Sequence, residues 1–363
     1  MSKLSKLSFF NYFIPILSLV ILIITRHSLQ ANYWIFILAA TFLGFSVMSA
    51  VHHAEIIAHK IGEGLGTLVL AISVTVIEVG LILALMGKDG GSASFLARDT
   101  VFAAVMIVTN GIVAICLMLG GLKFKEQEFQ VQGSKSLLVV LIALSFLVFV
   151  LPNFTTSTSG PTYNNLQMIF IGAFSLILYM LFIFFQTTSH KSYFEPTTGV
   201  INVQEILGKE ITKKEAWLSF ISLCVSLIAV VGFAKRISPN IEQIVVFLGA
   251  PKSVVGVLIA GIVLLPESWS AVTSARANRL QTSLNLALGS GIASIALTIP
   301  SVIVYSIIKK LPLNLGLDNK NLAFMLLTFL VSTTTLGSGK STLLQGAVHA
   351  VILLTYFVVS FIP

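Results

Sequence analysis

The chain has 363 residues, of which 56% are hydrophobic and only 10% are charged, and its mean hydropathy is +0.97. Lys and Arg outnumber Asp and Glu by 22 to 14, which gives a formal net charge of +8. Soluble domains carry about 25% charged residues. This composition therefore excludes soluble enzymes, nucleic-acid-binding proteins and disordered proteins, and it indicates a polytopic membrane protein.

Eleven apolar runs follow one another along the chain, and a helix needs about 20 residues to cross the bilayer core. They lie near residues 9–25, 33–60, 65–86, 99–120, 136–151, 165–187, 216–249, 252–275, 280–308, 321–337 and 343–361. None alternates with a period of two, so helices are expected rather than a β-barrel. The first run lacks a small-residue cleavage site, which favours a retained helix over a signal peptide.

The distribution of lysines predicts the orientation of these helices. The loops 121–135 and 188–215 are rich in Lys, whereas the loop 152–164 carries no charge. Cytoplasmic loops of membrane proteins carry an excess of Lys and Arg. The first two loops are therefore expected on the cytoplasmic side, and the third on the outer side. The 188–215 segment mixes Glu with Lys and is expected to be a solvated linker or a short surface helix.

The two halves of the chain share a pattern of glutamates. The long run 33–60 carries Glu55, which precedes Gly62 by seven positions, and the long run 216–249 carries Glu242, which precedes Gly249 by the same spacing. In each half the next run carries a single glutamate, Glu78 in the first and Glu267 in the second. Chance agreement is the alternative to an internal duplication.

Each half contains five runs, and five is an odd number. A second copy with five helices must enter the membrane from the opposite side, which predicts inverted repeats as in many secondary transporters. The expected organisation is an extra N-terminal helix at 1–30, a first repeat at 31–187, a cytoplasmic linker at 188–215 and a second repeat at 216–363. The fold class predicted is an all-α polytopic membrane protein of about eleven transmembrane helices.

Glu78 and Glu267 are costly residues to place in apolar helices. A carboxylate near the middle of a membrane helix costs about 2.5–3.5 kcal/mol on insertion scales. A structural ion pair is the alternative, but no other run carries Lys or Arg at a matching depth. Two carboxylates that share one low-dielectric site cannot both stay ionised, so they would bind either protons or a cation. Such a site is expected near the middle of the bilayer.

Further oxygen ligands would have to complete the site, since Ca²⁺ takes six to eight oxygens. Ser73 and Thr75 precede Glu78 by about one turn, and Pro266 leaves a backbone carbonyl without its usual donor. The third run of each half carries a polar residue among small ones, Asn110 in the first and Ser290 in the second. These two residues would support the site or serve helix packing.

A proton path or entrance is the expectation for the remaining acidic residues and the histidines beside them. Glu55 and Glu242 hold equivalent places in the two halves but lie nearer a membrane edge. His52 and His53 are close to Glu55, and histidine titrates near physiological pH. Ordinary interfacial exposure is the alternative for all four residues.

A glycine-rich segment near the C-terminus is not a phosphate-binding loop. The segment LGSGKST (336–342) has Thr334 where the motif requires its first Gly, and it joins two apolar runs rather than following a strand. A turn between two helices is expected there.

Long segments of the sequence resemble a known transporter family. HHAEIIAHKIGEGLGTLVLAISVTVIEV (52–79), LARDTVFAAVMIVTNGIVAICL (96–117), SARANRLQTSLNLALGSGIASIALTIP (274–300) and TLGSGKSTLLQGAVH (335–349) closely resemble the ChaA-type calcium/proton antiporters of the cation/calcium exchanger superfamily. The resemblance implies eleven helices, two inverted repeats and exchange of cytoplasmic Ca²⁺ for external protons. It also implies that Glu78 and Glu267 bind the cation. Two departures concern selectivity: Thr75 and Leu264 stand where the superfamily usually has Asn, and Ser268 and Trp269 follow Glu267.

The sequence therefore predicts a proton-coupled antiporter with Ca²⁺ and protons as its ions, no cofactor, no enzymatic activity and no nucleic-acid partner. A Na⁺ or K⁺/proton antiporter is the main alternative, and a cation channel using the same glutamates is a weaker one. A bacterial cytoplasmic membrane is the expected location, and a homo-oligomer is left open.

Overall fold

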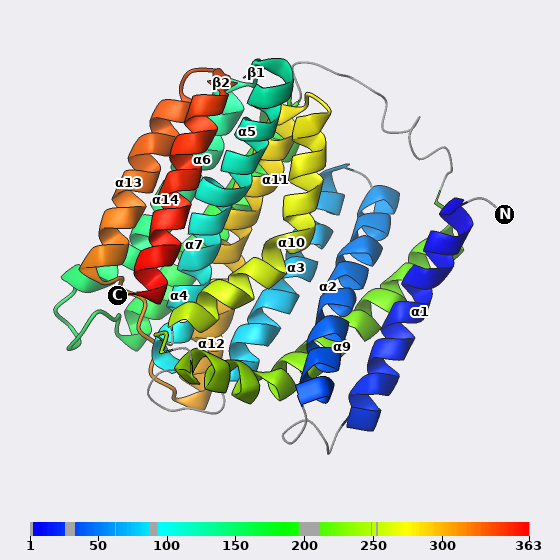
Figure 1. The fold of residues 1–363 in the computed structure, drawn as a ribbon. Helices are drawn as coiled ribbons and strands as arrows, with labels where there is room; N and C mark the ends of the chain where they lie inside the picture. The colour runs from blue at the N-terminus through cyan, green and yellow to red at the C-terminus, as the bar shows by residue number, and fades with distance from the viewer. Residues whose placement is uncertain are drawn as a thin grey trace. The chain divides into compact units, whose positions relative to one another are not determined.

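The computed structural model describes residues 3–25, 33–61, 63–86, 93–195, 211–247, 249–251 and 253–362, and most of them are helical (Figure 1). The α-helices are α1 (Lys3–Ile24), α2 (Tyr33–Ile61), α3 (Glu63–Met86), α4 (Ala93–Ile107), α5 (Val113–Phe124), α6 (Val131–Ser145), α7 (Asn165–Phe184), α9 (Lys213–Phe247), α10 (Ser253–Arg276), α11 (Leu280–Ala293), α12 (Ile299–Lys309), α13 (Asn319–Leu336) and α14 (Leu343–Phe361). The π-helical turns are η2 (Val108–Ile112), η3 (Phe146–Val150), η5 (Phe185–Ser189) and η7 (Ser294–Thr298), and the 3-10 turns are η4 (Leu151–Phe154) and η6 (Lys191–Tyr193). The strands are β1 (Glu126–Glu128) and β2 (Lys340–Thr342).

Each of the eleven predicted runs coincides with a helical segment. Among the described residues, eight helices are long and apolar enough to cross a membrane, and α1 and α3 contain the shorter apolar stretches 12–24 and 71–86. The eleventh, α13, has 18 residues. The all-α polytopic fold is therefore confirmed. Most of the predicted 188–215 linker, residues 196–210, lies outside the described residues.

Several segments are helical on both sides of a π turn. The chain from α4 through η2 to α5 and the chain from α11 through η7 to α12 are each continuous helical segments. Pro300 follows η7, and a proline cannot donate to the preceding turn, so the helix has to adjust there. In contrast, α10 continues as an α-helix through Pro266.

The chain forms two compact units that do not follow the predicted repeats. Unit 1 contains Met1–Asp89 and Asn202–Gly249, and unit 2 contains Gly90–Ile201 and Ala250–Pro363. The division of the sequence into two inverted halves is a different partition, and it stays a prediction.

Unit 1 is built around the two longest helices. The 29-residue α2 packs along the 35-residue α9, and α1 and α3 pack against both. Polar groups join these helices: the hydroxyl groups of Ser226 and Ser49 lie 3.3 Å apart, and Arg236 of α9 donates to the Leu22 carbonyl near the end of α1. Arg236 thereby satisfies a carbonyl that the helix end leaves without a donor.

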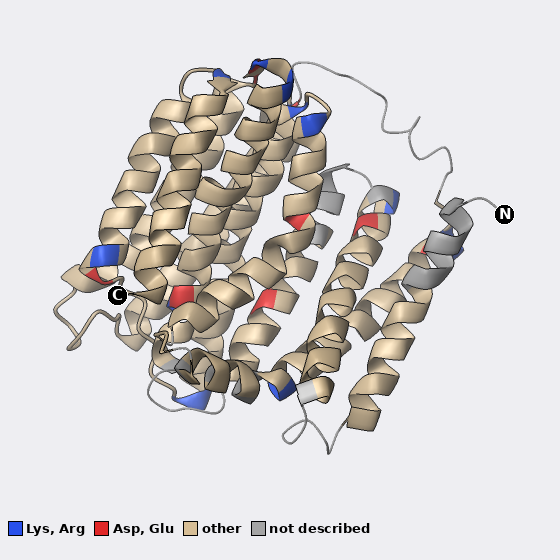
Figure 2. Ribbon diagram, viewed as in Figure 1, with Lys and Arg blue, Asp and Glu red and all other residues tan. Residues whose placement is uncertain are grey.

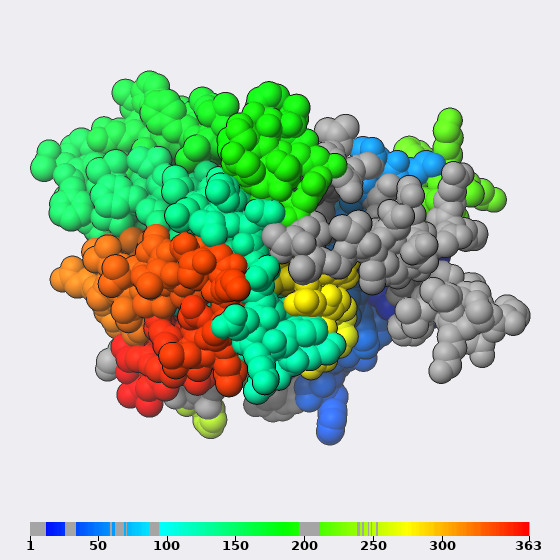
Figure 3. All heavy atoms as spheres, turned by 90° about the horizontal axis from the view of Figure 1, so that it is seen from above, coloured from blue at the N-terminus to red at the C-terminus, as the bar shows by residue number. Residues whose placement is uncertain are grey.

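One end of unit 2 is closed by the short antiparallel pair β1–β2. Glu126 is opposite Thr342, and the exposed Lys340 and Glu128 form an ion pair of 3.1 Å. The turn that follows α10 is attached to the same end, because Lys123 donates to the carbonyl of Arg276. Figure 3 looks onto this end, where the segments around β1, β2 and the start of α11 lie beside one another.

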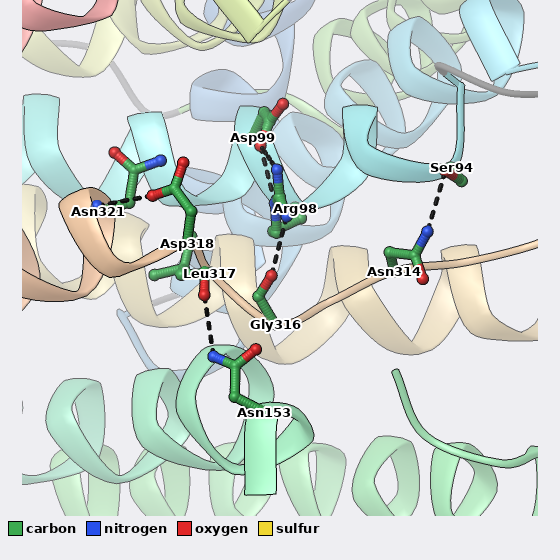
Figure 4. Close-up of polar contacts among 9 residues, drawn as sticks. All are labelled: Ser94, Arg98, Asp99, Asn153, Asn314, Gly316, Leu317, Asp318 and Asn321. Atoms are coloured by element: carbon green, nitrogen blue, oxygen red, sulfur yellow. Dashed lines mark hydrogen bonds and ion pairs between the residues drawn. The ribbon is translucent and has the colours of Figure 1, made fainter. Parts of the chain in front are cut away.

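The other end of unit 2 is closed by the extended segment 311–318 (Figure 4). Arg98 of α4 pairs with Asp99 at 2.7 Å and donates to the Gly316 carbonyl at 2.8 Å. The Gly316 amide donates to the Pro161 carbonyl, and Asn153 donates to the Leu317 carbonyl. The segment is therefore bound both to α4 and to the loop before α7.

The two closures are reciprocal. At one end, β1 follows the third helical segment of the first half and pairs with β2, which precedes the last helix of the second half. At the other end, the segment after the third helical segment of the second half binds the loop before the last helix of the first half. A two-fold relation between inverted halves produces this exchange of partners. The closures thus support the predicted repeat.

Candidate functional site

Glu78 lies in α3 of unit 1, and its side chain is 3% exposed. Thr75, also buried, is three residues away and so shares the face of the helix that carries Glu78. Ser73 is buried as well, but five residues place it on a different face, and its hydroxyl donates to the Val69 carbonyl at 2.8 Å. Of the two predicted supporting hydroxyls, the one on Thr75 is the better placed.

Glu267 lies in α10 of unit 2 and is half-buried. The hydroxyl of Ser290 in α11 donates to its carboxylate. The structure therefore brings together two residues that were predicted separately. The second carboxylate oxygen of Glu267 is not part of this bond. Tyr179 of α7, buried at 2% exposure, lies close enough to Glu267 to interact electrostatically.

Asn110 lies in the π turn η2 and is completely buried. Val108 of the same turn packs beside Gly291 of α11, where a Cβ would lie 3.5 Å from the Val108 side chain. Gly291 follows Ser290 directly, so the predicted pair of polar, small-residue segments meets where these two helices cross. Small residues allow such close crossings in membranes.

The amide of Asn110 takes part in a buried hydrogen-bond network. It donates to the hydroxyl of Thr328 at 2.8 Å, and its oxygen lies 2.9 Å from Nδ1 of His349. The other ring nitrogen of His349 lies 3.2 Å from the Thr335 hydroxyl. The network joins η2 to α13 and α14, all in unit 2.

The residues of α2 predicted for a proton path lie in different surroundings. His53 is completely buried beside Tyr12, with ring centroids 4.9 Å apart, whereas His52 and Glu55 are half-buried. Glu242 belongs to α9, but its side chain lies outside the described part of the chain.

No three side chains of His, Cys, Asp or Glu converge on a metal position anywhere in the described ranges. The Ser290 hydroxyl and the Glu267 carboxylate are oxygen groups, the type of ligand that Ca²⁺ and the alkali cations prefer.

Comparison with known proteins gives the family. Residues 31–188 and residues 218–362 both match the family described as "Sodium/calcium exchanger protein", and together they cover more than half of the chain. The chain belongs to the sodium/calcium exchanger protein family. The two matched stretches have nearly the same bounds as the two predicted repeats.

Several relatives resemble this exchanger over most of its length. It is 41% identical over 355 residues to y4hA of Sinorhizobium fredii, whose name describes an ionic transporter, with 97% of this chain and 96% of y4hA covered. It is 31% identical over 351 residues to the sodium-potassium/proton antiporter ChaA of Escherichia coli, with 96% and 94% covered. It is 26% identical over 323 residues to the Ca²⁺/H⁺ antiporter of Aphanothece halophytica, with 84% and 83% covered.

The fold of this exchanger is shared with a solved structure. The H⁺/Ca²⁺ exchanger CAX superposes with a TM-score of 0.73 at 16% identity, with 97% of this chain and 88% of CAX covered. The predicted family resemblance is thus confirmed. The protein is a multi-pass membrane transporter of a cation/proton exchanger family and not an enzyme, and the ions that it moves are substrates rather than cofactors.

Two groups near the candidate residues had no counterpart in the sequence prediction. His349 is 239 positions from Asn110 in the sequence. Tyr179 lies in an apolar run, and nothing in the sequence indicated a role for its hydroxyl group. A buried histidine in an otherwise apolar helix was the only signal available for the first. The sequence contained none for the second.

Proposed function

We propose that this exchanger moves Ca²⁺ from the cytoplasm in exchange for protons, and that Glu78 and Glu267 are the carboxylates that alternately hold the proton and the cation. The observation that supports this most directly is a carboxylate in each of two apolar helices, buried at Glu78 and half-buried at Glu267, with Glu267 accepting a hydrogen bond from Ser290. Relatives named as Ca²⁺/H⁺ antiporters support the choice of ion.

The exchange follows from competition for the same carboxylate oxygens. A proton on a glutamate removes the negative charge that a cation requires, and a bound cation makes protonation unfavourable. Protons arriving on one side therefore release the cation there, and loss of the protons on the other side allows the next cation to bind. Two carboxylates exchange at most two protons for one Ca²⁺.

The hydroxyl of Ser290 has a defined part in this cycle. Because it donates to the carboxylate of Glu267, it stabilises the ionised form that binds the cation. Thr75 is placed to serve Glu78 in the same way, since both side chains share one face of α3. Glu55, Glu242, His52 and His53 are proposed to lead protons or cations toward these sites.

The second candidate is exchange of Na⁺ or K⁺ for protons. It is favoured by one observation: the sodium-potassium/proton antiporter ChaA is more similar to this chain than the Ca²⁺/H⁺ antiporter of Aphanothece halophytica, at 31% against 26% identity. Since both relatives are bacterial, we propose that the protein resides in a bacterial cytoplasmic membrane.

Transport by the purified protein in liposomes tests the proposal. With an imposed pH gradient, Ca²⁺ uptake should be accompanied by proton movement in the opposite direction, and Na⁺, K⁺, Mg²⁺ and Mn²⁺ should compete less well than Ca²⁺. Stronger uptake of Na⁺ or K⁺ would favour the second candidate. Cation flux without proton counterflow would contradict both and identify a channel.

A further inference from the structure

Three basic residues gather around the turn that joins α10 to α11, at the end of unit 2 that carries β1 and β2. Lys123, in the last turn of α5, donates from its ammonium group to the Arg276 carbonyl at 2.9 Å. Arg276 is the last residue of α10, and Arg279 directly precedes α11. Lys123 and Arg276 are exposed, and Arg279 is half-buried. These three residues are called the turn cluster below.

The two carboxylates that follow the turn cluster's lysine in the sequence are engaged elsewhere. Glu126 and Glu128 of β1 alternate with Gln127, so their side chains lie on the opposite face of the strand from the Gln127 side chain. Glu128 pairs with Lys340 at 3.1 Å, and Glu126 interacts electrostatically with the same ammonium group. Gln127, in contrast, donates to the Ala275 carbonyl at the end of α10. The strand therefore directs its carboxylates toward Lys340 and only its neutral amide toward the turn cluster.

The charges of the turn cluster are not neutralised within the described part of the chain. None of its three residues forms an ion pair there, although the hydrogen bond from Lys123 to the Arg276 carbonyl brings two like charges together. The Nε atom of Arg279 is buried and has no hydrogen-bond partner among the described residues. A buried donor without a partner costs free energy, and so do like charges held together. A bound anion would supply both the missing acceptor and the missing negative charge.

Exposed apolar side chains lie on the same two helices, closer to the middle of the membrane. On α5, Leu122 directly precedes Lys123 and is 67% exposed, and Ile115, two turns earlier on the face of Leu122, is 48% exposed. On α10, Trp269 lies two turns before Arg276 on the same face and is 76% exposed. A phospholipid fits this combination, because its acyl chains contact apolar side chains while its phosphate contacts cations. A soluble anion would use only the cations.

We propose that the turn cluster binds the phosphate of an anionic phospholipid in the leaflet at this end of the protein. Lys123 and Arg276 contribute charge, and Arg279 contributes a planar guanidinium whose Nε–H and Nη–H groups can donate in parallel to two phosphate oxygens. Basic pockets between membrane helices bind anionic headgroups on the cytoplasmic side, which is the side predicted for this end. The bound lipid connects α5 to the α10–α11 turn and thereby stabilises unit 2. The inference does not depend on which ion the exchanger transports.

Lipid binding is measured on the purified full-length protein in detergent micelles, as the rise in melting temperature on addition of phosphatidylglycerol or of phosphatidylcholine. We expect phosphatidylglycerol to act on the wild-type protein at lower mole fractions than phosphatidylcholine. One cation near the membrane surface contributes about fivefold to the binding of an anionic lipid. Lys123→Gln and Arg276→Gln should therefore each raise the mole fraction of phosphatidylglycerol needed for half of the effect by about fivefold.

Lys340→Gln is the matched control. It removes the same charge from the same end of unit 2, but from a lysine that is already paired with Glu128. The turn cluster predicts that this variant stays within about twofold of the wild-type protein, as expected for an exposed ion pair. If Lys340→Gln weakens the effect of phosphatidylglycerol as much as Arg276→Gln does, only the overall charge of this end matters and the inference is overturned.

Two further arms complete the test. If Lys123→Gln does not fold, Arg276→Gln decides the outcome alone, because the backbone carbonyl of residue 276 still accepts from Lys123 in that variant. Sodium phosphate, added in place of lipid, separates a lipid headgroup from a soluble anion and should leave the melting temperature unchanged. The inference is wrong if sodium phosphate reproduces the effect of phosphatidylglycerol, or if the wild-type protein does not distinguish phosphatidylglycerol from phosphatidylcholine. Since binding rather than transport is measured, failure of the proposed cation/proton exchange would not alter these results.

Discussion

Ser290 is the residue through which the structure connects α11 to the carboxylate of Glu267. Hydrogen bonds to a charged group contribute about 1.5–3 kcal/mol, and about 1.4 kcal/mol corresponds to a tenfold change in an equilibrium constant. Loss of this donor should therefore weaken cation binding far more than it disturbs the helix, because Ser290 is only half-buried.

Ser290→Ala is expected to raise the apparent KM for the transported cation by roughly tenfold, while Ser290→Thr, which keeps the hydroxyl, should change it much less. Transport assays over a range of cation concentrations measure the effect. Ser301→Ala is the control, because that hydroxyl is exposed on α12 and donates only to the Leu297 carbonyl. Equal KM values for Ser290→Ala and the wild-type protein would remove Ser290 from the site.

Single residues were predictable from the sequence to the extent that they conflict with their surroundings. Glu78 and Glu267 stand out because carboxylates are rare in apolar helices. The partners of Asn110 were not predictable, because Thr328 and His349 are 218 and 239 positions away and only the folded chain brings them together. Polar side chains in membrane helices form such contacts with whichever helix lies opposite.

At the level of elements, close helix packing in unit 2 depends on glycines. A Cβ on Gly346 of α14 would lie 2.8 Å from the Met118 amide nitrogen and 2.9 Å from the Ala114 carbonyl oxygen of α5. These are backbone atoms, so α14 would have to move away from α5. Apolar groups gain nothing from leaving lipid, and packing contacts supply much of the association between membrane helices.

Gly346→Ala should therefore destabilise the protein by about 1–3 kcal/mol, the usual cost of overpacking. Gly261→Ala in α10 is the matched control, because a Cβ there meets nothing within 4 Å. Thermal unfolding of the detergent-solubilised proteins compares them. If both variants melt at the same temperature, the α5–α14 contact does not limit stability.

Tyr163 ties the loop before α7 to the end of the neighbouring helical segment. Its side chain is 3% exposed, and its hydroxyl donates to the Leu147 carbonyl at 2.6 Å. Burial raises the pKa of Tyr163 above its ordinary value. The neutral phenol is therefore the native form, and its stabilising contribution is present below the unfolded-state pKa of about 10 and declines as the pH rises above it.

Tyr163→Phe is expected to lower the free energy of unfolding by about 1 kcal/mol at neutral pH, because one buried hydrogen bond is lost. The difference from the wild-type protein should stay constant between pH 6 and 9 and shrink above about pH 10. Melting curves measured across this range test both statements. A difference that grows at high pH would contradict the assigned role.

The positions of the helices could be predicted from hydropathy, but the π turns and the short strands could not. All eleven runs were recognised because each is long and apolar. The π turns gave no signal, since a turn of five residues changes neither composition nor period. The pair β1–β2 was also missed, because three-residue strands are too short to show alternation.

At the scale of the whole molecule, the distribution of charge in unit 2 predicts which of its ends faces the cytoplasm. The end that carries β1 and β2 has seven basic and three acidic residues among those described, whereas the opposite end has four basic and two acidic residues. Figure 2 shows Lys and Arg concentrated around the β1–β2 end. From the positive-inside rule we expect this end in the cytoplasm, which is the same prediction that the loops give.

Labelling with a membrane-impermeant maleimide checks this orientation. In a protein whose Cys116 and Cys224 have been replaced by Ser, Ser159→Cys should react in intact cells, and Lys340→Cys only in everted vesicles. Both positions are exposed, and α6 separates the two ends that they mark. The reverse pattern would invert the assigned direction of transport.

The central claim is that the carboxylates of Glu78 and Glu267 exchange protons for a cation. Cation uptake driven by a pH gradient, measured for Glu78→Gln and Glu267→Gln in liposomes, tests it most directly, with Glu195→Gln as a control that removes an exposed charge. We predict that both glutamine variants insert normally and transport no more than empty liposomes, while Glu195→Gln matches the wild-type protein. Robust proton-coupled uptake by Glu78→Gln or Glu267→Gln would contradict the claim.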